Sequence, residues 1–518
     1  MTRVPQTCAV IGCWRYAVAL VCTAAVFPTC GQSDVPESPA KRGLVISPSL
    51  SISETLTNNK RLSSGTAGSD AITQISPAIH IAGASGRVKG FFDYSLNGLI
   101  YARGSESNEL QNALNGAGQI EAIENFAFVD VSANISQQLL SAYGTRSADS
   151  ASINSNRTEV RSYSVSPYVR GRLSDFAAYD ARLTYGGSRS GDNDAANSAS
   201  WQAFLRLGGD NTARFVNWSV DASRSVVGYD LGPRSVDDRL RGIAYLAVDP
   251  SLRLSLIAGR ESNNFLTGER ESHNTPGWGV DWTPTERTRV SAVREQRFFG
   301  KSHAFLFEHR TPRSVWRYSD SRDISTGLGQ PTLGQVGTIY DLFFAQFASL
   351  QPDPTLRGQL VNEFLARNGV SAATPIFAQV LASTVTLQRR RDLSLALIGL
   401  RSTITFIGSQ SEVRRLADTV SVADDFSNGN TVRQRGFSAQ VSHRLTPDSS
   451  LSFIASLDRA SGTTSLRSTR LLSISAFWTT QLGSRTGLSL GARHAVFDGS
   501  SNDSYTESAL TAALTYRF

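Results

Sequence analysis

Apolar and polar residues alternate with a period of two along most of this chain, and this pattern constrains the fold more than any other feature. Successive side chains of a β-strand point to opposite faces of the sheet, so such alternation predicts strands with one apolar and one polar face. Clear examples are Arg87–Ala102, Ala177–Tyr185 and Phe437–Arg444. Roughly twenty such segments, separated by Ser, Asn, Gly and Asp, follow one another from Leu44 to Phe518, which indicates one repetitive architecture.

These segments are typical of a transmembrane barrel, whose strands of about ten residues alternate between lipid and lumen. We therefore predict an all-β fold, a transmembrane antiparallel up-and-down β-barrel of about 22 strands within a range of about 18 to 24. A soluble sandwich of half-buried strands is the alternative. One face of the last segment ends on an aromatic residue at the C-terminus, which we interpret as the signal for barrel-assembly machinery. This face consists of Leu510, Ala512, Leu514, Tyr516 and Phe518.

The N-terminus carries the longest apolar run, Tyr16–Phe27, whose 12 residues are too few for a transmembrane helix of about 20. The run follows Arg3 and Arg15 and has the form of a secretory signal peptide. All four cysteines lie in the first 30 residues, so the mature chain would keep one cysteine at most. A secreted chain of this length without disulfides needs another source of stability, and a closed barrel in lipid supplies it.

The predicted domain organisation follows from this run and from the alternation. We predict a signal peptide at residues 1–25, with cleavage as late as residue 30, then a periplasmic linker at 26–43 and the barrel at 44–518. Lipidation of Cys30 is a weaker alternative, because Phe27, Pro28 and Thr29 fit a lipidation motif poorly.

Loop lengths give an independent indication of topology, because outer-membrane barrels have short periplasmic turns and longer extracellular loops. Counting back from Phe518, short polar gaps alternate with long ones and place both termini in the periplasm. In this count Ser411–Asn430 is a long outer loop, Arg391-Asp392 is a tight inner turn, and Phe299–Ser302 is a short outer exception.

One stretch departs from the strand pattern. Residues 336–370 have helical spacing, and Asp353-Pro354 combines an N-cap residue with proline at the first helical position. We predict an extracellular or lumen-facing helical insert within residues 322–376. It would constrict the lumen, cap the mouth of the barrel, or pack on itself at the surface.

The predicted lumen carries more arginine than acid, and rings of basic side chains favour anionic solutes. The alternative is that these charges pair with one another and only fill the polar interior. Tryptophans spread along the strands are typical of girdles at the lipid–water interface, with sugar stacking as a second interpretation. The candidate lumen-facing residues are Arg87, Asp93, Arg170, Arg172, Arg182, Arg206, Arg253, Arg390, Arg444 and Arg493.

The sequence does not favour an enzyme, a cofactor or a metal site. Gly487–Gly491 matches G-x-S-x-G, but that motif needs a strand–turn–helix elbow, and here it begins an alternating strand in which Ser489 and His494 lie on opposite faces. Losing Arg3 and Arg15 with the signal peptide lowers the formal net charge from +7 to +5, which does not suggest nucleic-acid binding.

The chain also resembles a family of uncharacterised outer-membrane proteins associated with the PEP-CTERM/exosortase system of Gram-negative bacteria. The resemblance depends on the order of Ile46–Thr55, Ser164–Arg170, Arg297–Gly300 and Arg313–Trp316, followed by the helical insert and Phe518. It implies a role in exopolysaccharide or surface-protein export and carries over no catalytic residue.

Two functions therefore stay open: a pore or export conduit, and a structural or assembly component with a plugged lumen. The expected partners are outer-membrane lipid, the barrel-assembly machinery, and anionic polysaccharide or export-system components.

Overall fold

The chain divides into two units, Met1–Ala40 and Lys41–Phe518, and the described residues belong to the second. A computed structural model describes residues 43–65, 68–103, 108–149, 151–174, 176–191, 197–209, 215–326, 340, 344, 357, 358, 361, 384–416, 425, 426, 431–463, 467–499 and 503–518. The predicted signal peptide and all of the predicted linker except Gly43 lie outside these residues. Among the described residues, no helix is long and apolar enough to cross a membrane.

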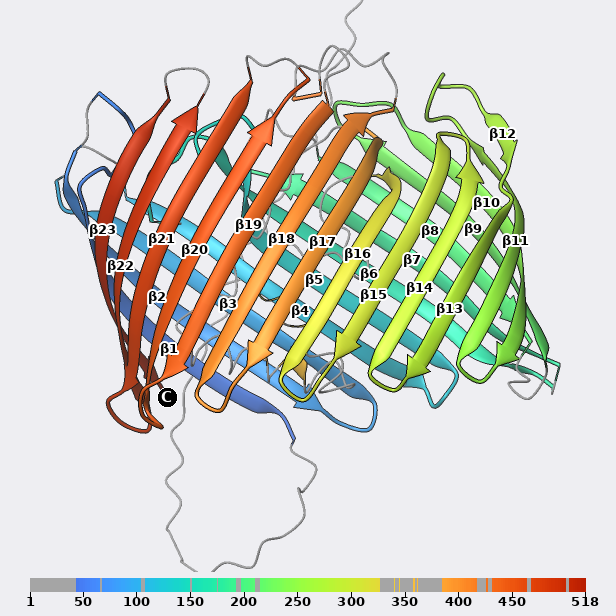
Figure 1. Cartoon of the computed structure of the whole chain (residues 1–518), viewed down its shortest axis with the longest axis horizontal. Coiled ribbons are helices and arrows are strands. Elements are labelled where there is room, and N and C mark those ends of the chain that lie inside the picture. Colours follow the sequence, from blue (N-terminus) through green and yellow to red (C-terminus); the bar gives the residue numbers. More distant parts are fainter. Residues whose placement is uncertain are drawn as a thin grey trace, which may run out of the picture. The chain divides into compact units, whose positions relative to one another are not determined.

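The described unit consists of strands joined in chain order (Figure 1). The first strands are β1 (Val45–Thr57), β2 (Asp70–Ala84), β3 (Val88–Tyr101), β4 (Glu109–Ile123), β5 (Ala127–Leu139), β6 (Arg157–Leu173), β7 (Ala177–Ser190), β8 (Ser198–Gly208), β9 (Val216–Tyr229), β10 (Ser235–Asp249), β11 (Leu252–Asn263) and β12 (Glu271–Asn274). The others are β13 (Gly277–Thr285), β14 (Thr288–Arg297), β15 (Gly300–Arg310), β16 (Ser314–Ser325), β17 (Thr386–Ile398), β18 (Ser402–Arg415), β19 (Thr431–Arg444), β20 (Ser449–Ser461), β21 (Ser468–Gln481), β22 (Thr486–Gly499) and β23 (Tyr505–Arg517).

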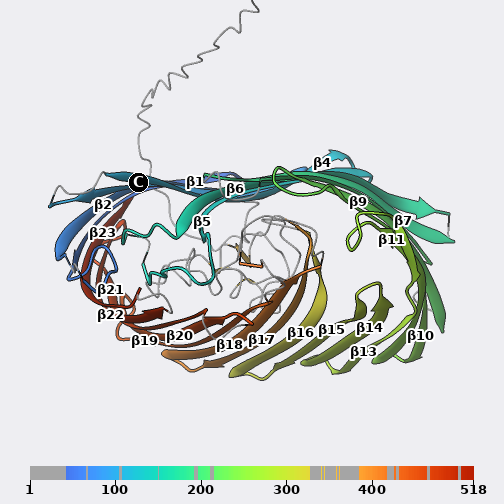
Figure 2. The same ribbon diagram turned by 90° about the horizontal axis from the view of Figure 1, so that it is seen from above.

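Every neighbouring pair is antiparallel, and the sheet closes because β1 pairs with β2 on one side and with β23 on the other (Figure 2). β12 and β13 both pair with β11 and form one interrupted strand, so 23 strand segments make a 22-strand barrel. The interruption falls at Pro276, which has no N–H to give to the ladder. The predicted all-β, up-and-down, 22-strand barrel is confirmed.

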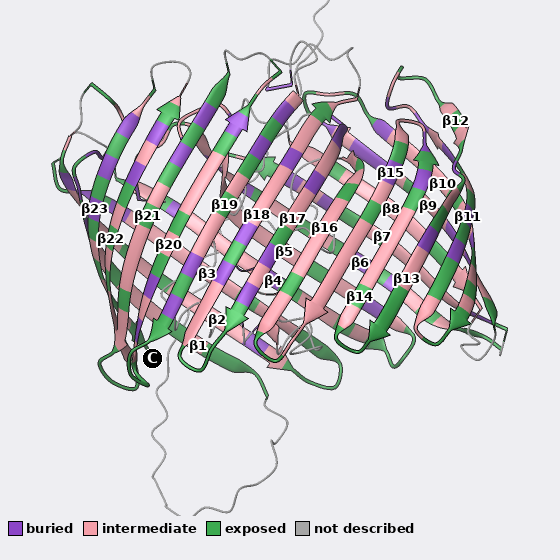
Figure 3. Ribbon diagram, in the orientation of Figure 1, coloured by how far each residue is buried: buried purple, intermediate pink, exposed green. Residues whose placement is uncertain are grey.

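Residues that pair in register share a face of the sheet, so one contact inside the ring assigns the faces of all strands. Tyr505 and Glu507 contact a chain segment inside the ring, and odd residues of β23 therefore face the lumen. Even residues face outward, among them Leu510 and Leu514, which are 59% and 46% exposed. Figure 3 shows exposed positions recurring along the strands. The predicted assembly signal thus forms the outward face of β23, where Tyr516 and Phe518 meet edge to face at 5.0 Å.

The two ends of the barrel differ in their connections. At the end where Phe518 lies, which we name the short-turn end, strands are joined by two to seven residues. At the opposite, long-loop end, the connections include residues 58–69, 140–156, 326–385 and 416–430. The predicted short exception, Phe299–Ser302, corresponds to the connection Phe298-Phe299 at the long-loop end, because β15 begins at Gly300.

One predicted turn is wrong. Arg391-Asp392 lies inside β17, and the turn that follows this strand is residues 399–401. Within this strand Arg390 points into the lumen, and its neighbours Arg389 and Arg391 point outward, where they pair with Asp320. β18 likewise continues to Arg415, so the outer loop that follows it begins later than the predicted Ser411.

The predicted helical insert falls mostly outside the described residues. β16 continues to Ser325, so the first residues of the predicted range 322–376 belong to a strand. Of the insert itself, Tyr340, Phe344, Arg357, Gly358 and Val361 are described. The rings of Tyr340 and Phe344 stack at 5.8 Å, which suits a four-residue helical spacing. The insert as a whole stays a prediction.

Candidate functional site

The connection between β5 and β6 folds into the barrel. Figure 2 shows this segment inside the ring of strands. We name residues 140–149 and 151–156 the inner loop. It leaves the wall at β5, yet its hydrogen bonds and apolar contacts reach β2, β3, the β1–β2 connection and β19 to β23, so it crosses part of the lumen.

The first part of the inner loop is fixed to the wall beside β19 to β21. Ser141 Oγ and Ala142 N donate to the two carboxylate oxygens of Asp425, at 2.7 and 2.6 Å. Thr469 Oγ1 of β21 donates to the carbonyl of Ala142 at 3.3 Å. Ala142 is buried in an apolar cluster with Phe426, Val432 and Ala460.

The middle of the inner loop is held by a buried ion pair. Arg493 of β22 donates one guanidinium nitrogen to Asp149 at 2.6 Å and another to Glu507 of β23 at 3.0 Å. The Glu507 side chain is fully buried, so the arginine joins loop and wall where water is excluded. The Tyr505 hydroxyl donates to the carbonyl of Arg146 at 2.5 Å. Ala148 packs on the apolar cluster of Leu62, Leu471, Ala495, Phe497 and Tyr505.

The last part of the inner loop lies on β2 and β3 and beside the β1–β2 connection. The Tyr101 hydroxyl donates to the carbonyl of Ala151 at 3.3 Å, and Ile153 N donates to the carbonyl of Lys60 at 3.2 Å. Ala151 and Ile153 pack against Ile72, Leu99 and Tyr101. Three groups of contacts along the loop therefore hold it inside the lumen.

The inner loop is also tied within itself. Asn156 Nδ2 donates to the carbonyls of Ser141 and Thr145 at 2.9 and 3.1 Å, while its Oδ1 accepts from Ser141 N at 2.9 Å. Gly144 allows this closure, because a Cβ at that position would lie 2.4 Å from Cγ of Asn156. The loop thus has a defined shape as well as fixed attachment points.

Arg146 is buried at the centre of the inner loop. Burial lowers the pKa of its guanidinium, and the nearby carboxylates of Asp458 and Asp425 act in the opposite direction. Arg146 Nη2 donates to the carbonyl of Ala142 at 3.3 Å, which adds to the closure of the loop.

The wall formed by β8 to β14 carries a chain of ion pairs that face the lumen. Asp221 pairs with Arg206 at 2.7 Å and Arg241 at 2.9 Å, and Arg241 continues to Glu295 at 2.8 Å. Arg241 and Glu295 are not on neighbouring strands, because β11 and β13 lie between them. Gly277 of β13 leaves room for the Glu295 side chain to reach Arg241, because a Cβ at position 277 would lie 2.7 Å from Cγ of Glu295.

A second group of lumen charges lies between β11 and β16. Arg297, buried, pairs with Glu261 at 2.8 Å and with Asp323. Glu261 also accepts a hydrogen bond from Phe298 N at 2.6 Å. Charges that pair so closely stabilise the wall and contribute little net field to the lumen.

The structure places the predicted lumen residues as follows. Arg87 lies in the turn between β2 and β3, where its carbonyl accepts from Glu121 N at 2.7 Å, and so does not belong to a strand. Arg444 ends β19 at the short-turn end and is exposed. The other eight lie on lumen faces of strands, although the barrel separates them widely.

Most of these lumen residues have partners. Arg182 pairs with Asp130 at 2.8 Å, Arg253 with Asp281 at 3.5 Å, and Arg390 with Asp392 at 2.7 Å. Asp93 pairs with His80. The Arg170 guanidinium lies 4.3 Å from the ring centroid of Phe128. Arg172 lies on the same lumen face of β6 as Arg170, Arg206 pairs with Asp221, and Arg493 pairs with Asp149 and Glu507.

Sequence reasoning missed the inner loop, which contains Asp149, and its partners Asp425 and Glu507. A signal was present, since residues 140–156 form a long polar gap that contains three alanines and Ile153. Small apolar residues scattered in such a loop indicate that the loop packs against another part of the protein. Nothing in the sequence showed that the partner wall lay more than 300 residues away.

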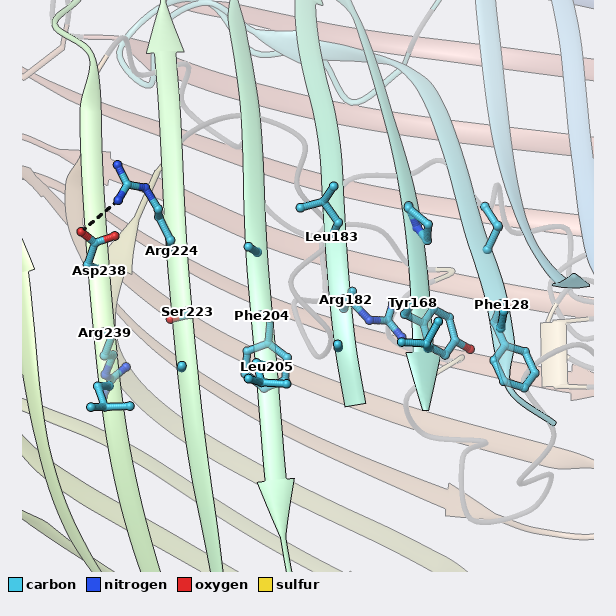
Figure 4. Close-up of a pocket in the computed structure, with 18 of the residues that line it drawn as sticks. Phe128, Tyr168, Arg182, Leu183, Phe204, Leu205, Ser223, Arg224, Asp238 and Arg239 are labelled. Carbon is cyan, nitrogen blue, oxygen red and sulfur yellow. Dashed lines mark ion pairs between the residues drawn. The ribbon is translucent and has the colours of Figure 1, made fainter. Parts of the chain in front are cut away.

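A cavity of about 850 Å³ runs across β5 to β11 (Figure 4). On each of these strands its lining is a run of three residues whose first and last members face outward, such as Leu183 and Leu205. The cavity is therefore an apolar groove on the outward face and not a solute site in the lumen. Near the long-loop end it meets the ion pair of Arg224 and Asp238, 3.6 Å apart.

The predicted chance match to G-x-S-x-G lies within β22, away from any strand–turn–helix elbow. His494 faces outward and shares a 2.9 Å hydrogen bond with Ser508, while Ser489 faces the lumen. Among the described residues, no group of three His, Cys, Asp or Glu side chains is placed to hold a metal ion.

A closed barrel with a polar, ion-paired lumen and an apolar outward face is an outer-membrane β-barrel. Its outward Leu256, Phe437 and Ile474 are 70%, 52% and 53% exposed, as expected of side chains that meet lipid.

No protein-family model matches the chain, and no curated protein matches it. Solved structures with a similar barrel include the siderophore receptor PirA from Pseudomonas aeruginosa, 9% identical over 93% of this chain and 81% of that one, with a TM-score of 0.45. The FrpB iron transporter from Neisseria meningitidis is 11% identical over 92% of this chain and 83% of its own, with a TM-score of 0.48. PirA from Acinetobacter baumannii is 10% identical over 91% of this chain and 80% of its own, with a TM-score of 0.48. What those receptors bind is a property of those proteins.

Proposed function

We propose that this outer-membrane β-barrel is a conduit whose lumen is narrowed by the inner loop. The observation that carries the proposal is the buried junction of Arg493 with Asp149 and Glu507, which fixes the loop inside the ring. A loop that served only as a surface connection would need no such attachment. A polar lumen crossed by a rigid loop suits the passage of hydrophilic solutes of limited size.

We propose weak charge selectivity for this conduit. The anion preference expected from the lumen arginines requires unpaired cations, but Arg182, Arg206, Arg253 and Arg493 are each paired with a carboxylate. Lumen carboxylates, including Asp281 and Glu507, offset their charge. The ion pairs therefore support the alternative in which lumen charges mainly stabilise the wall.

We also propose, from the resemblance described above, a role in exopolysaccharide or surface-protein export linked to a PEP-CTERM/exosortase system. Only the order of Ile46–Thr55, Ser164–Arg170 and Arg297–Gly300 supports this role. Ile46–Thr55 falls on β1, where Ile46 and Ile52 face outward, and Ser164–Arg170 falls on β6. These segments build the wall of the barrel. A test is deletion of the gene followed by measurement of released polysaccharide.

Single-channel conductance in planar bilayers tests the conduit. One variant replaces residues 142–155 by Asn-Gly, a short hairpin turn that removes the inner loop. A milder variant combines Asp149→Asn with Tyr505→Phe, which weakens two attachments and keeps the loop. Arg485→Gln, at the exposed short-turn end, is the matched control.

We expect steady channels from the wild type and the control, and a conductance at least about twofold larger from the loop-deleted variant, because a wider constriction passes more ions. The milder variant should fluctuate between the two levels. If neither the wild type nor the loop-deleted variant conducts, although both are folded, the conduit is refuted. The structural or assembly role with a plugged lumen would then be preferred.

A further inference from the structure

Positive charge is concentrated on the outward face of β14 to β19, toward the long-loop end. We name this set the outer basic face. It consists of Arg294, Lys301, Arg322, Arg389, Arg391, Arg414, Arg433 and Arg435.

Register assigns these side chains to the outward face. Arg390 pairs in register with Ser321 and Ser411, on the lumen face of the sheet. Arg389 and Arg391 are its neighbours along β17 and so point outward, on the same side as Leu393, which is 49% exposed. In register with them lie Arg322 and Glu412, and beyond these lies Arg433.

Carboxylates within the face do not balance the cations. Asp320 accepts from Arg389 at 3.1 Å, Arg391 at 3.2 Å and His303 at 3.0 Å. Glu412 lies 3.6 Å from Arg433. Asp320 and Glu412 are the only outward carboxylates of these six strands, which are fully described, so eight cations and two carboxylates give a formal charge of +6 with histidine neutral.

The outer basic face begins where the apolar outward surface of the same strands ends. Toward the short-turn end the outward residues are Trp316, Leu393, Phe406 and Phe437, which are 36% or more exposed. The opposite wall differs, because β1 to β5 carry no outward Lys or Arg. Charge at the edge of an apolar belt lies at the depth of lipid headgroups, and its concentration on β14 to β19 indicates a specific contact.

We propose that the outer basic face binds the phosphate groups of the phosphorylated glycolipid that forms the outer leaflet of a Gram-negative outer membrane. The proposal relies on the membrane orientation of the proposed conduit, in which the long loops are extracellular. Arginine forms bidentate, charge-assisted hydrogen bonds with phosphate, and several guanidinium groups spaced across adjacent strands match more than one phosphate. Unbalanced cations beside an apolar belt are stabilised where anionic headgroups reach them.

Native mass spectrometry of the intact purified barrel tests this proposal. The probe is lipid A, a bisphosphorylated, acylated glucosamine disaccharide, and the comparison probes are chemically dephosphorylated lipid A and phosphatidylglycerol. The test variant is Arg433→Gln with Arg435→Gln, two exposed side chains outside the Asp320 cluster. The control is Arg161→Gln, an exposed arginine on β6 that pairs with Glu159 at 2.7 Å. Heat-dependent mobility in SDS shows that each variant is folded.

We expect the double variant to bind lipid A about tenfold or more weakly than the wild type, since each basic residue near an anionic surface contributes about 1 kcal/mol. The control should bind as the wild type does, and dephosphorylated lipid A should bind weakly to all forms. Equal binding of phosphatidylglycerol or dephosphorylated lipid A, or equal loss in the control, would overturn the proposal. So would a dimer of the wild type that the double variant loses, which would assign the face to a second copy.

Channel conductance separates this proposal from the proposed conduit. The double variant should conduct as the wild type does, because Arg433 and Arg435 face away from the lumen. Loss of lipid binding with normal conductance supports the lipid site, and a conduit that fails to conduct leaves the lipid measurement intact.

Discussion

Arg493 is the residue on which the inner loop most depends. We predict that Arg493→Gln destabilises the barrel by about 3 to 5 kcal/mol, because it leaves the buried Glu507 carboxylate without its cationic partner. The measurement is urea unfolding of the refolded protein in detergent, followed by the loss of the compact form in SDS gels.

The double variant Arg493→Gln with Glu507→Gln is the control for this prediction, since it removes both charges. It should recover a substantial part of the lost stability, because an amide pair needs no counter-ion. A single variant as stable as the wild type would mean that the loop is held by its apolar contacts alone.

At the residue scale, the sequence predicted which face of its strand a charged side chain occupies better than it predicted which side chain it pairs with. Period-two alternation was sufficient to assign Asp93, Arg182 and Arg493 to one side of their strands. Whether a lumen charge is free or paired depends on the strand beside it and, for Arg493, on a loop 344 residues away. The carboxylates that pair with the arginines therefore could not be identified from one strand at a time.

At the element scale, β17 shows how a local pattern misleads. Three arginines and an aspartate resemble a solvated turn, but they lie within a strand, where Asp320 of β16 and Asp392 of the same strand supply the opposite charges. We predict that single cysteines introduced along β17 alternate in reactivity. Leu393→Cys should react with a lipid-soluble maleimide, and Ser394→Cys should not, because only residue 393 faces outward.

Leu395→Cys and Ala396→Cys repeat that comparison two residues further along the strand. The background is favourable, since all four native cysteines lie in the first 30 residues. Equal reactivity of cysteines at positions 393 and 394 would contradict the assignment of these residues to a strand and would favour a turn at this position.

The inner loop was beyond prediction for a different reason. Its boundaries follow from the strands around it, but the direction in which a connection folds depends on contacts that are distant in sequence. Tyr505 and Asp425 meet the loop across 359 and 283 residues. Asn156 and Gly144 fix its shape locally, and this local closure is the part of the loop that a sequence pattern could have shown.

At the scale of the whole molecule, the strand number was predictable because loop lengths and strand direction constrain each other. Each strand reverses direction, so a displaced turn such as Arg391-Asp392 moves a boundary without changing the count. Closure adds a constraint of its own, because β1 and β23 pair through nine register positions from Ser49↔Arg517 to Thr57↔Ala509. A barrel closed in this way has no free edge in lipid.

Closure leads to the last prediction. Closed barrels keep their hydrogen bonds in SDS until heated, so the unboiled protein should migrate differently from the boiled protein. A variant that lacks Tyr505–Phe518 removes the partner of both β1 and β22, and it should show one mobility and fail to enter membranes. The loop-deleted variant should keep two mobilities, because all strand pairs remain. If the variant without β23 still shows the compact form, the ring does not close between β1 and β23, and the face assignments that follow from closure would fail with it.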